Sequence, residues 1–287
     1  MKKPPIQILL ELLAYLPIRV QYRLARILAF VVTRINNQIS LQTEKNIHLC
    51  FNGLNHSRQI DLKKSTVRHT CYALIELAAV WCWPVKKILA KIEQEEICKK
   101  FSHTDKGRLV IAPHLGSWEL LNIWLAANGR VFSLYKPQRN ARVDNFILQS
   151  RTRNGAQLVP TDAFGLRKLI KGLKRGATVM ILPDQKPRSD AAQIDSQFFG
   201  HVASTSLLIQ NICKRIDCNV FIAAMYRNEK STTFSLCIES LDHHRLAGPE
   251  VDSAQYLNDQ IENMVRTHLD QYQWSYERFT SAEYKTL

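Results

Sequence analysis

From residue 108 onward, short apolar runs alternate with amphipathic stretches of about 13 residues, and this alternation restricts the possible folds more than any other feature. The apolar runs predict buried strands at 108–113, 131–137, 156–160, 177–183 and 219–227. The stretches between them predict helices at 117–129, 143–155, 164–176 and 204–216. Strands that alternate with helices in this way predict an α/β fold with a mostly parallel central sheet flanked by helices on both faces.

Polar side chains follow three of the predicted strands. They are His114 after the first strand, Lys136 and Arg139 after the second, and Asp184, Gln185, Lys186 and Arg188 after the fourth. Ligands of such sheets bind beyond the carboxyl ends of the strands. A histidine, a carboxylate and several cations at one sheet edge therefore predict a binding or catalytic site there.

The stretch HLGSWEL places Glu119 five residues after His114. This spacing alone carries little information, since nine histidines and 25 acidic residues in 287 produce it about once by chance, and His56 with Asp61 repeats it. At 114 the histidine ends a strand, Gly116 is placed to turn the chain, and a helix follows. We expect Glu119 to fold back onto the imidazole, fix its tautomer and make it a base toward an alcohol. The alternative is a hydrogen-bonded structural histidine.

The N-terminal residues 6–32 are apolar but interrupted by a glutamate, a proline and three arginines. They lack the 18 to 20 uninterrupted apolar residues of a spanning helix, and no small-residue cleavage site follows them. Arg19, Arg23 and Arg26 share one helix face, which is typical of a helix lying in a membrane interface. The alternative is a helix that covers a soluble core. Polar residues 35–47 predict a connection to a helical region at 62–92, which Pro84 ends or bends.

The net charge of +14 indicates polyanionic partners, such as nucleic acid, anionic lipid, phosphorylated substrates or acidic proteins. No clustered basic and aromatic stretch or nucleic-acid-binding motif is present, so nucleic acid is not expected. The seven cysteines are scattered without the spacing of a zinc site, so we expect reduced thiols and no metal. The absence of P-loop, GxGxxG and GxSxG motifs disfavours nucleotide binding and serine hydrolysis by those routes.

The stretch HLGSWEL resembles the HX4E motif of the lysophospholipid acyltransferase superfamily, in particular that of the bacterial lipid A late (secondary) acyltransferases of the lauroyl and myristoyl type. Further stretches follow in the family's order, namely LPIRVQYRLARILAF, EKNIHLCF, LYKPQRN, SRTRNGAQLVP, LRKLIKGLKRGATVMILPDQ, FFGHVAST and YQWSYERF. The resemblance extends from about residue 16 to residue 280.

The resemblance implies a glycerol-3-phosphate acyltransferase-like fold. With the N-terminal pattern, it leads us to expect membrane-interface helices at 1–34 and an acyltransferase domain at 35–287. It implies an inner-membrane enzyme whose site faces the cytoplasm. Such an enzyme moves a fatty acyl group from acyl carrier protein to a hydroxyl of a Kdo-bearing lipid A precursor. The partners would be the carrier protein, the anionic lipid precursor and the inner membrane surface, and no cofactor beyond the acyl carrier thioester is expected.

Residue by residue, the resemblance implies that His114 is the general base and Glu119 its charge-relay partner. Substrate-binding roles would fall to Arg151, Asp184, Gln185, Lys136, Arg139 and Arg188. Among these, the planar forks of the arginines suit a phosphate headgroup best.

Near the C-terminus the chain departs from the family, because Tyr276 and Glu277 replace the usual histidine and arginine. A lysophospholipid, a glycolipid or an aminolipid thus stays open as the acceptor. A membrane-bound homologue without catalysis is a further alternative.

Overall fold

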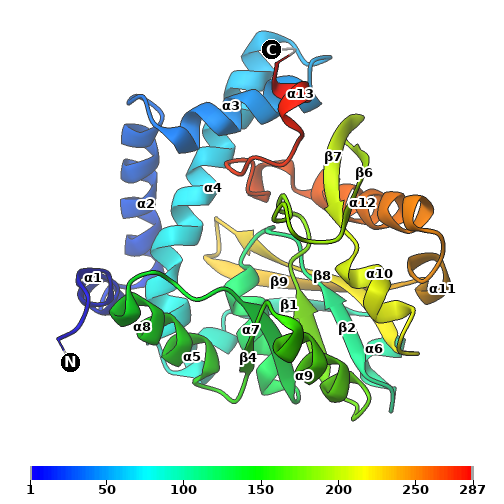
Figure 1. The fold of residues 1–287 in the computed structure, drawn as a ribbon. Helices are drawn as coiled ribbons and strands as arrows, with labels where there is room; N and C mark the ends of the chain where they lie inside the picture. The colour runs from blue at the N-terminus through cyan, green and yellow to red at the C-terminus, as the bar shows by residue number, and fades with distance from the viewer. Residues whose placement is uncertain (1, 286–287) are drawn as a thin grey trace.

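The computed structural model describes residues 2–285, and its centre is a seven-stranded sheet (Figure 1). In spatial order the strands are β1 (Ile92–Ile97), β9 (Thr233–Leu241), β8 (Asn219–Asn228), β2 (Arg108–Ile111), β5 (Thr178–Ile181), β3 (Val131–Tyr135) and β4 (Gln157–Pro160). The five strands from β8 to β4 run parallel, whereas β9 is antiparallel to β8, and β1 is parallel to β9. The predicted α/β class with a mostly parallel sheet is confirmed.

Successive residues of the central strands point into two separate apolar cores, one on each face of the sheet. In β2, Leu109 and Ile111 belong to one core and Val110 to the other. The first core is closed by α9 (Ala163–Leu173), α10 (Leu208–Cys213) and α12 (Glu250–Thr267). The second is closed by α7 (Trp118–Ala127), α4 (His56–Cys82) and α2 (Ile18–Val32). Apolar residues at every position of a strand are the signature of a sheet covered on both faces.

The N-terminal helices differ in part from the prediction. The segment 35–47, expected to be a connection, lies mostly in helix α3 (Gln38–Cys50), and α4 begins at His56 rather than near 62. The reason is that α3 buries polar residues: Asn46 donates to the carbonyl oxygens of Trp274 and Tyr276 at 2.6 and 2.7 Å. A helix with a polar buried face has no apolar stripe that periodicity could detect.

The second difference lies in the hairpin of β6 (Gln193–Phe198) and β7 (His201–Ser206). Residues 204–206, expected to open a helix, are the end of β7, and α10 begins only at Leu208. The remaining elements are α1 (Pro5–Ala14), α5 (Val85–Leu89), α6 (Lys99–Ser102), α8 (Ala141–Thr152), α11 (His243–Leu246), the short 3-10 helix η1 (Leu269–Gln271) and α13 (Ser281–Tyr284).

Helix α2 packs along α4, at the left of Figure 1, and buries Tyr22 and Ala25 in that contact. Its other face, like that of α1, exposes large apolar side chains, among them Leu12, Ile27 and Phe30. Among the helices of residues 2–285, none combines the length and the apolar character that a membrane-spanning helix requires. Membrane association of this region and its division from the rest at residue 34 stay predictions.

Candidate active site

His114 and Asp184 come together because their strands are neighbours in register. Strand β2 pairs with β5 so that Ile111 lies beside Ile181, and each polar residue follows three positions later. Asp184 Oδ1 lies 2.8 Å from His114 Nδ1, and Asp184 Oδ2 accepts from the backbone N–H of His114 at 2.8 Å. One carboxylate therefore holds both the ring and the main chain of the histidine.

The contacts of His114 define its tautomer. An ionised carboxylate only accepts hydrogen bonds, so Nδ1 carries the proton and Nε2 keeps the lone pair of a neutral imidazole. The amide nitrogen of Gln185 lies 3.1 Å from Nε2. Burial raises the pKa of the Asp184 carboxyl, but attraction to His114 and the hydrogen bonds from it outweigh burial and lower the pKa overall. Asp184 is thus ionised at neutral pH. Because it accepts the proton of Nδ1 in a hydrogen bond, Nε2 of His114 is left as the proton acceptor.

Glu119 lies in the first turn of α7, where its carboxylate turns toward α4 and α8. It forms a two-pronged ion pair with Arg151, whose Nε lies 3.0 Å from Oε2, and it accepts from Trp81 Nε1 at 3.1 Å. A buried carboxylate needs such partners. The expected direct pairing of Glu119 with His114 is therefore replaced: Asp184 and Gln185 engage the two ring nitrogens, and Glu119 holds Arg151 instead.

Arg151, near the end of α8, presents a fixed positive charge beside Glu119. Burial lowers the pKa of its guanidinium, but the adjacent Glu119 carboxylate outweighs burial, so the pKa is raised overall. The side chain is 27% exposed, so part of it reaches the surface. Because Glu119 already binds two nitrogens of the Arg151 guanidinium, this group is held in place while it stays charged.

Tyr276 and Trp118 pack against the imidazole of His114, with ring centroids 5.3 and 5.2 Å away. Burial raises the pKa of the Tyr276 phenol, and Gln185 is a hydrogen-bond partner of its hydroxyl. Tyr276 is also close enough to Arg151 to raise the pKa of that guanidinium. Tyr276, which in the sequence stands out only as a departure from the family pattern, lies against the histidine ring and within electrostatic range of Arg151.

The loop that carries His114 is tied down on both sides of Gly116. The glycine has φ +62°, and a Cβ there would lie 2.0 Å from the carbonyl oxygen of Met225. Its N–H donates to the carbonyl of Gln271 at 3.1 Å, and its own carbonyl accepts from Arg227 Nη2 at 2.6 Å. Only glycine adopts this conformation so close to another backbone without strain.

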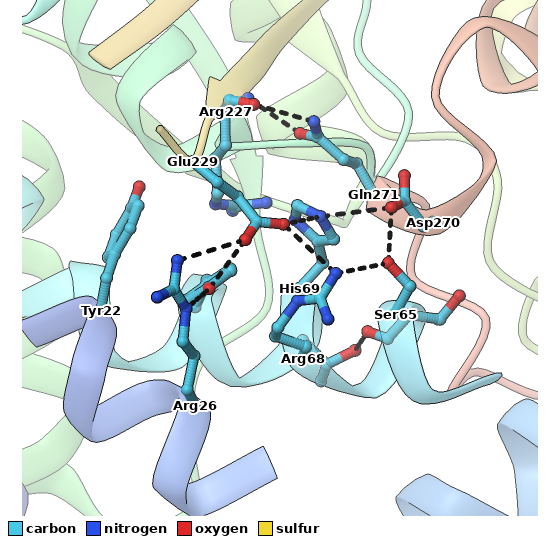
Figure 2. Close-up of polar contacts among 12 residues, drawn as sticks. Tyr22, Arg26, Ser65, Arg68, His69, Arg227, Glu229, Asp270 and Gln271 are labelled. Carbon is cyan, nitrogen blue, oxygen red and sulfur yellow. Dashed lines mark hydrogen bonds and ion pairs between the residues drawn. The ribbon is translucent and has the colours of Figure 1, made fainter. Parts of the chain in front are cut away.

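Arg227 is itself held by Glu76 through two hydrogen bonds of 2.6 Å, and both side chains are almost fully buried. The Gln271 side chain pairs with the backbone of Arg227, as the dashed lines of Figure 2 show. The sequence pattern does not indicate the Glu76–Arg227 pair. The available signal was a charged residue closing the apolar run that became β8.

The remaining predicted cations lie on the surface. Lys136 and Arg139 are exposed in the loop between β3 and α8. Arg188 is 64% exposed and pairs with Asp190 at 2.8 Å. None of the three belongs to the contacts described around His114 among residues 2–285, although they follow strands at the same sheet edge.

Chemically, the arrangement can supply a general base at Nε2 of His114. The accepting Nε2 faces Gln185, and within residues 2–285 no cluster of three or more metal-ligating side chains is found. The seven cysteines are unpaired. A bound hydroxyl compound could give its proton to Nε2 while the imidazolium is stabilised by Asp184.

The fold and this site define a class of α/β protein in which a carboxylate holds a histidine just beyond the strand ends of a mostly parallel sheet. A sequence model of the bacterial lipid A biosynthesis acyltransferases matches residues 6–281, and the chain belongs to this family. The resemblance inferred from the sequence motifs is thereby confirmed.

Curated relatives agree with this assignment at low identity. The chain is 23% identical to the lipid A biosynthesis palmitoleoyltransferase of Escherichia coli (strain K12), over 82% of this chain and 76% of that protein. It is 21% identical to the lipid A biosynthesis lauroyltransferase of the same strain, over 94% and 88% of the two chains. A lipid A biosynthesis acyltransferase of Haemophilus influenzae is 22% identical, over 92% and 83%.

Proposed function

We propose that this acyltransferase moves a fatty acyl chain from an acyl carrier protein thioester to a hydroxyl of a lipid A precursor, with His114 as the general base. The observation that carries the proposal is the contact of Asp184 with His114 Nδ1, which leaves Nε2 as the accepting nitrogen. The relatives named for lauroyl and palmitoleoyl transfer support a fatty acyl donor. No cofactor is required for this chemistry.

In the proposed reaction, Nε2 of His114 removes the proton of the acceptor hydroxyl as its oxygen attacks the thioester carbonyl. The new C–O bond forms an ester, the C–S bond breaks, and the imidazolium returns its proton to the departing thiolate. Asp184 stabilises the imidazolium through Nδ1, so no proton needs to reach the carboxylate. General-base catalysis of this kind contributes about 10²- to 10⁴-fold to a rate.

We assign Glu119 to holding Arg151, and Arg151 to binding negative charge at the site. The geometry supports this because Glu119 fixes the guanidinium while part of it stays exposed. The acceptor headgroup carries phosphate, which a fixed guanidinium recognises well. Lys136, Arg139 and Arg188 would assist as exposed cations at the same edge.

We place the enzyme at the cytoplasmic face of the inner membrane. The exposed apolar side chains of α1 and α2, such as Leu12, Ile27 and Phe30, suit an interface-lying helix pair. The net charge of +14 would attract both an acidic carrier protein and an anionic lipid surface. Both partners meet at such a surface, where the acyl chain can pass between them.

The proposal is tested with the purified full-length protein in detergent, supplied with lauroyl acyl carrier protein and a Kdo-bearing lipid A precursor. Mass spectrometry should show one added acyl chain with wild type and none above background with His114→Ala, while far-UV circular dichroism of the variant is unchanged. Transfer to a lysophospholipid instead would overturn the acceptor and keep the chemistry. Equal activity of His114→Ala and wild type would overturn the mechanism.

A further inference from the structure

A positively charged hollow outside the candidate active site lies between three parts of the chain. It is lined by the turn that joins α1 to α2, by residues of and next to α5, and by the turn between β8 and β9. Its volume is about 410 Å³, which is within the usual range for small-ligand sites. None of the residues of the His114 network lines it, so it needs a separate explanation.

The charges in this hollow are all of one sign. Arg19, Lys87 and Lys91 contribute three cations, and no carboxylate lines the hollow. Among residues 2–285 no ion pair is found for these three side chains, although Lys87 lies over the Trp83 ring at 3.8 Å. Three unneutralised cations around one concave site favour an anion.

Arg26, seven residues further along α2, shows what a neutralised arginine looks like in the same helix. It donates to the Tyr72 hydroxyl at 2.7 Å and lies 3.7 Å from Glu229. Figure 2 shows Glu229 at the centre of this network, where it also contacts His69 at 3.0 Å and Arg68 at 3.5 Å. Of the arginine row that the sequence indicated, Arg26 thus has partners within the chain although its side chain is 54% exposed, whereas no ion pair is found for Arg19 within residues 2–285.

The same network lies next to one wall of the hollow. Glu229 anchors the start of the β8–β9 turn, and two later residues of that turn, Ser231 and Thr232, line the hollow. Thr232 has φ +59°, a left-handed conformation that β-branched residues rarely adopt. Such a conformation persists where the surroundings hold it, which is frequent at binding sites.

The surroundings of the hollow identify the anion. Tyr15, which lines it, is 87% exposed, and Leu12 on the preceding turn of α1 is 61% exposed. Apolar side chains beside a cationic hollow match a lipid, whose chains contact the apolar residues while its phosphate enters the hollow. An acidic protein surface without apolar side chains would leave these apolar residues in water.

We propose that this hollow binds the phosphate of an anionic membrane phospholipid, through Arg19, Lys87 and Lys91, as a lipid site separate from the acceptor site. The proposal rests on the membrane location proposed above but not on the acyl transfer. It gives the protein a fixed orientation on the membrane, because the hollow joins α2, α5 and the β8–β9 turn.

The test compares two full-length triple variants of equal net charge. Arg19→Gln/Lys87→Gln/Lys91→Gln removes the cations of the hollow, and Arg167→Gln/Lys168→Gln/Lys171→Gln removes three exposed cations of α9. Binding is measured by flotation with vesicles of phosphatidylcholine alone and with 30% phosphatidylglycerol.

We expect the hollow variant to lose roughly 100-fold in affinity for the phosphatidylglycerol vesicles, since each cation close to an anionic surface contributes about fivefold. The α9 variant should change less than threefold, and both should bind phosphatidylcholine like wild type. Soluble glycerol phosphate should compete weakly, because it lacks the acyl chains. If inorganic phosphate competed as strongly as the phosphatidylglycerol itself, the site would be assigned to a free anion and the proposal would be overturned.

Equal losses of vesicle affinity in the two triple variants would show that net charge alone determines binding, and would overturn the proposed site. If the hollow variant had a raised KM for acyl carrier protein and unchanged vesicle affinity, the hollow would be assigned to the carrier protein and the lipid would be ruled out as its ligand. Absence of vesicle binding by wild type would overturn the membrane location and the site together. Lack of acyl transfer in detergent, with vesicle binding that depends on the three cations, would overturn the proposed function alone and support the site.

Discussion

Asp184 holds His114 twice, through Nδ1 of the ring and through the backbone N–H, at 2.8 Å in each case. The two residues are 70 positions apart in the chain and meet because β2 and β5 are neighbours in the sheet. Glu119, only five positions from His114, holds Arg151 instead. The two carboxylates that the family motifs contain thus serve different partners in this protein.

Asp184→Asn should lower kcat by about 10²- to 10⁴-fold, the usual contribution of a positioned base. An amide in that place can donate to Nδ1, which favours the tautomer with the proton on Nε2 and removes the accepting lone pair. Initial rates of acyl transfer measure the loss. Asp190→Asn, which changes an exposed carboxylate paired with Arg188, is the matched control and should keep wild-type kcat. Full activity of Asp184→Asn would contradict its role on the imidazole.

Arg151→Lys should raise KM for the anionic acceptor by about tenfold, equivalent to about 1.4 kcal/mol, and leave KM for the acyl carrier thioester unchanged. Lysine keeps the charge but cannot form the two-pronged contact with Glu119, so the charge is no longer held in place. Steady-state kinetics with each substrate varied in turn separate the two constants. An equal rise in both KM values would assign Arg151 to general folding of the site.

Removing one member of the buried Glu76 and Arg227 pair should destabilise the fold by about 3 to 5 kcal/mol, because the other charge is left buried without a partner. The double variant Glu76→Met/Arg227→Met should recover most of this stability, measured by urea unfolding. Its kcat should stay low, since the carbonyl of Gly116 has lost its donor and the His114 loop its tether. Recovery of kcat together with stability would show that the pair has no positioning role.

The stability of the protein should depend on pH through Glu229. Hydrogen bonding by His69 lowers the pKa of the Glu229 carboxyl to about 2, against a usual value of about 4.3. A lowered carboxyl pKa contributes stability above the unfolded-state value, and that stability is lost as pH falls from about 4.3 toward 2. Wild type should therefore be more stable than Glu229→Gln at pH 7, with the difference shrinking below pH 4. Urea midpoints at pH 7, 5, 4 and 3 measure this, and a constant difference would contradict it.

Local pattern predicted the elements whose apolar residues face a core. The strands at 108–111, 178–181 and 219–228 appear where buried runs indicated them, since a strand covered on both faces is apolar at every position. Helix α3 was missed because its inward face carries Asn46 and other polar residues. The edge strand β1 was missed because its sequence, IEQEEI, is largely exposed.

The sequence by itself determined the α/β class, the family and the set of polar residues that gather at one sheet edge. It did so because strand ends and family motifs are local in the chain. Only the tertiary structure decided that Asp184 rather than Glu119 holds the imidazole, and that Arg227 ties down the loop. Those contacts depend on strand order and register, which join residues far apart in sequence, and local periodicity carries no information about which strands become neighbours.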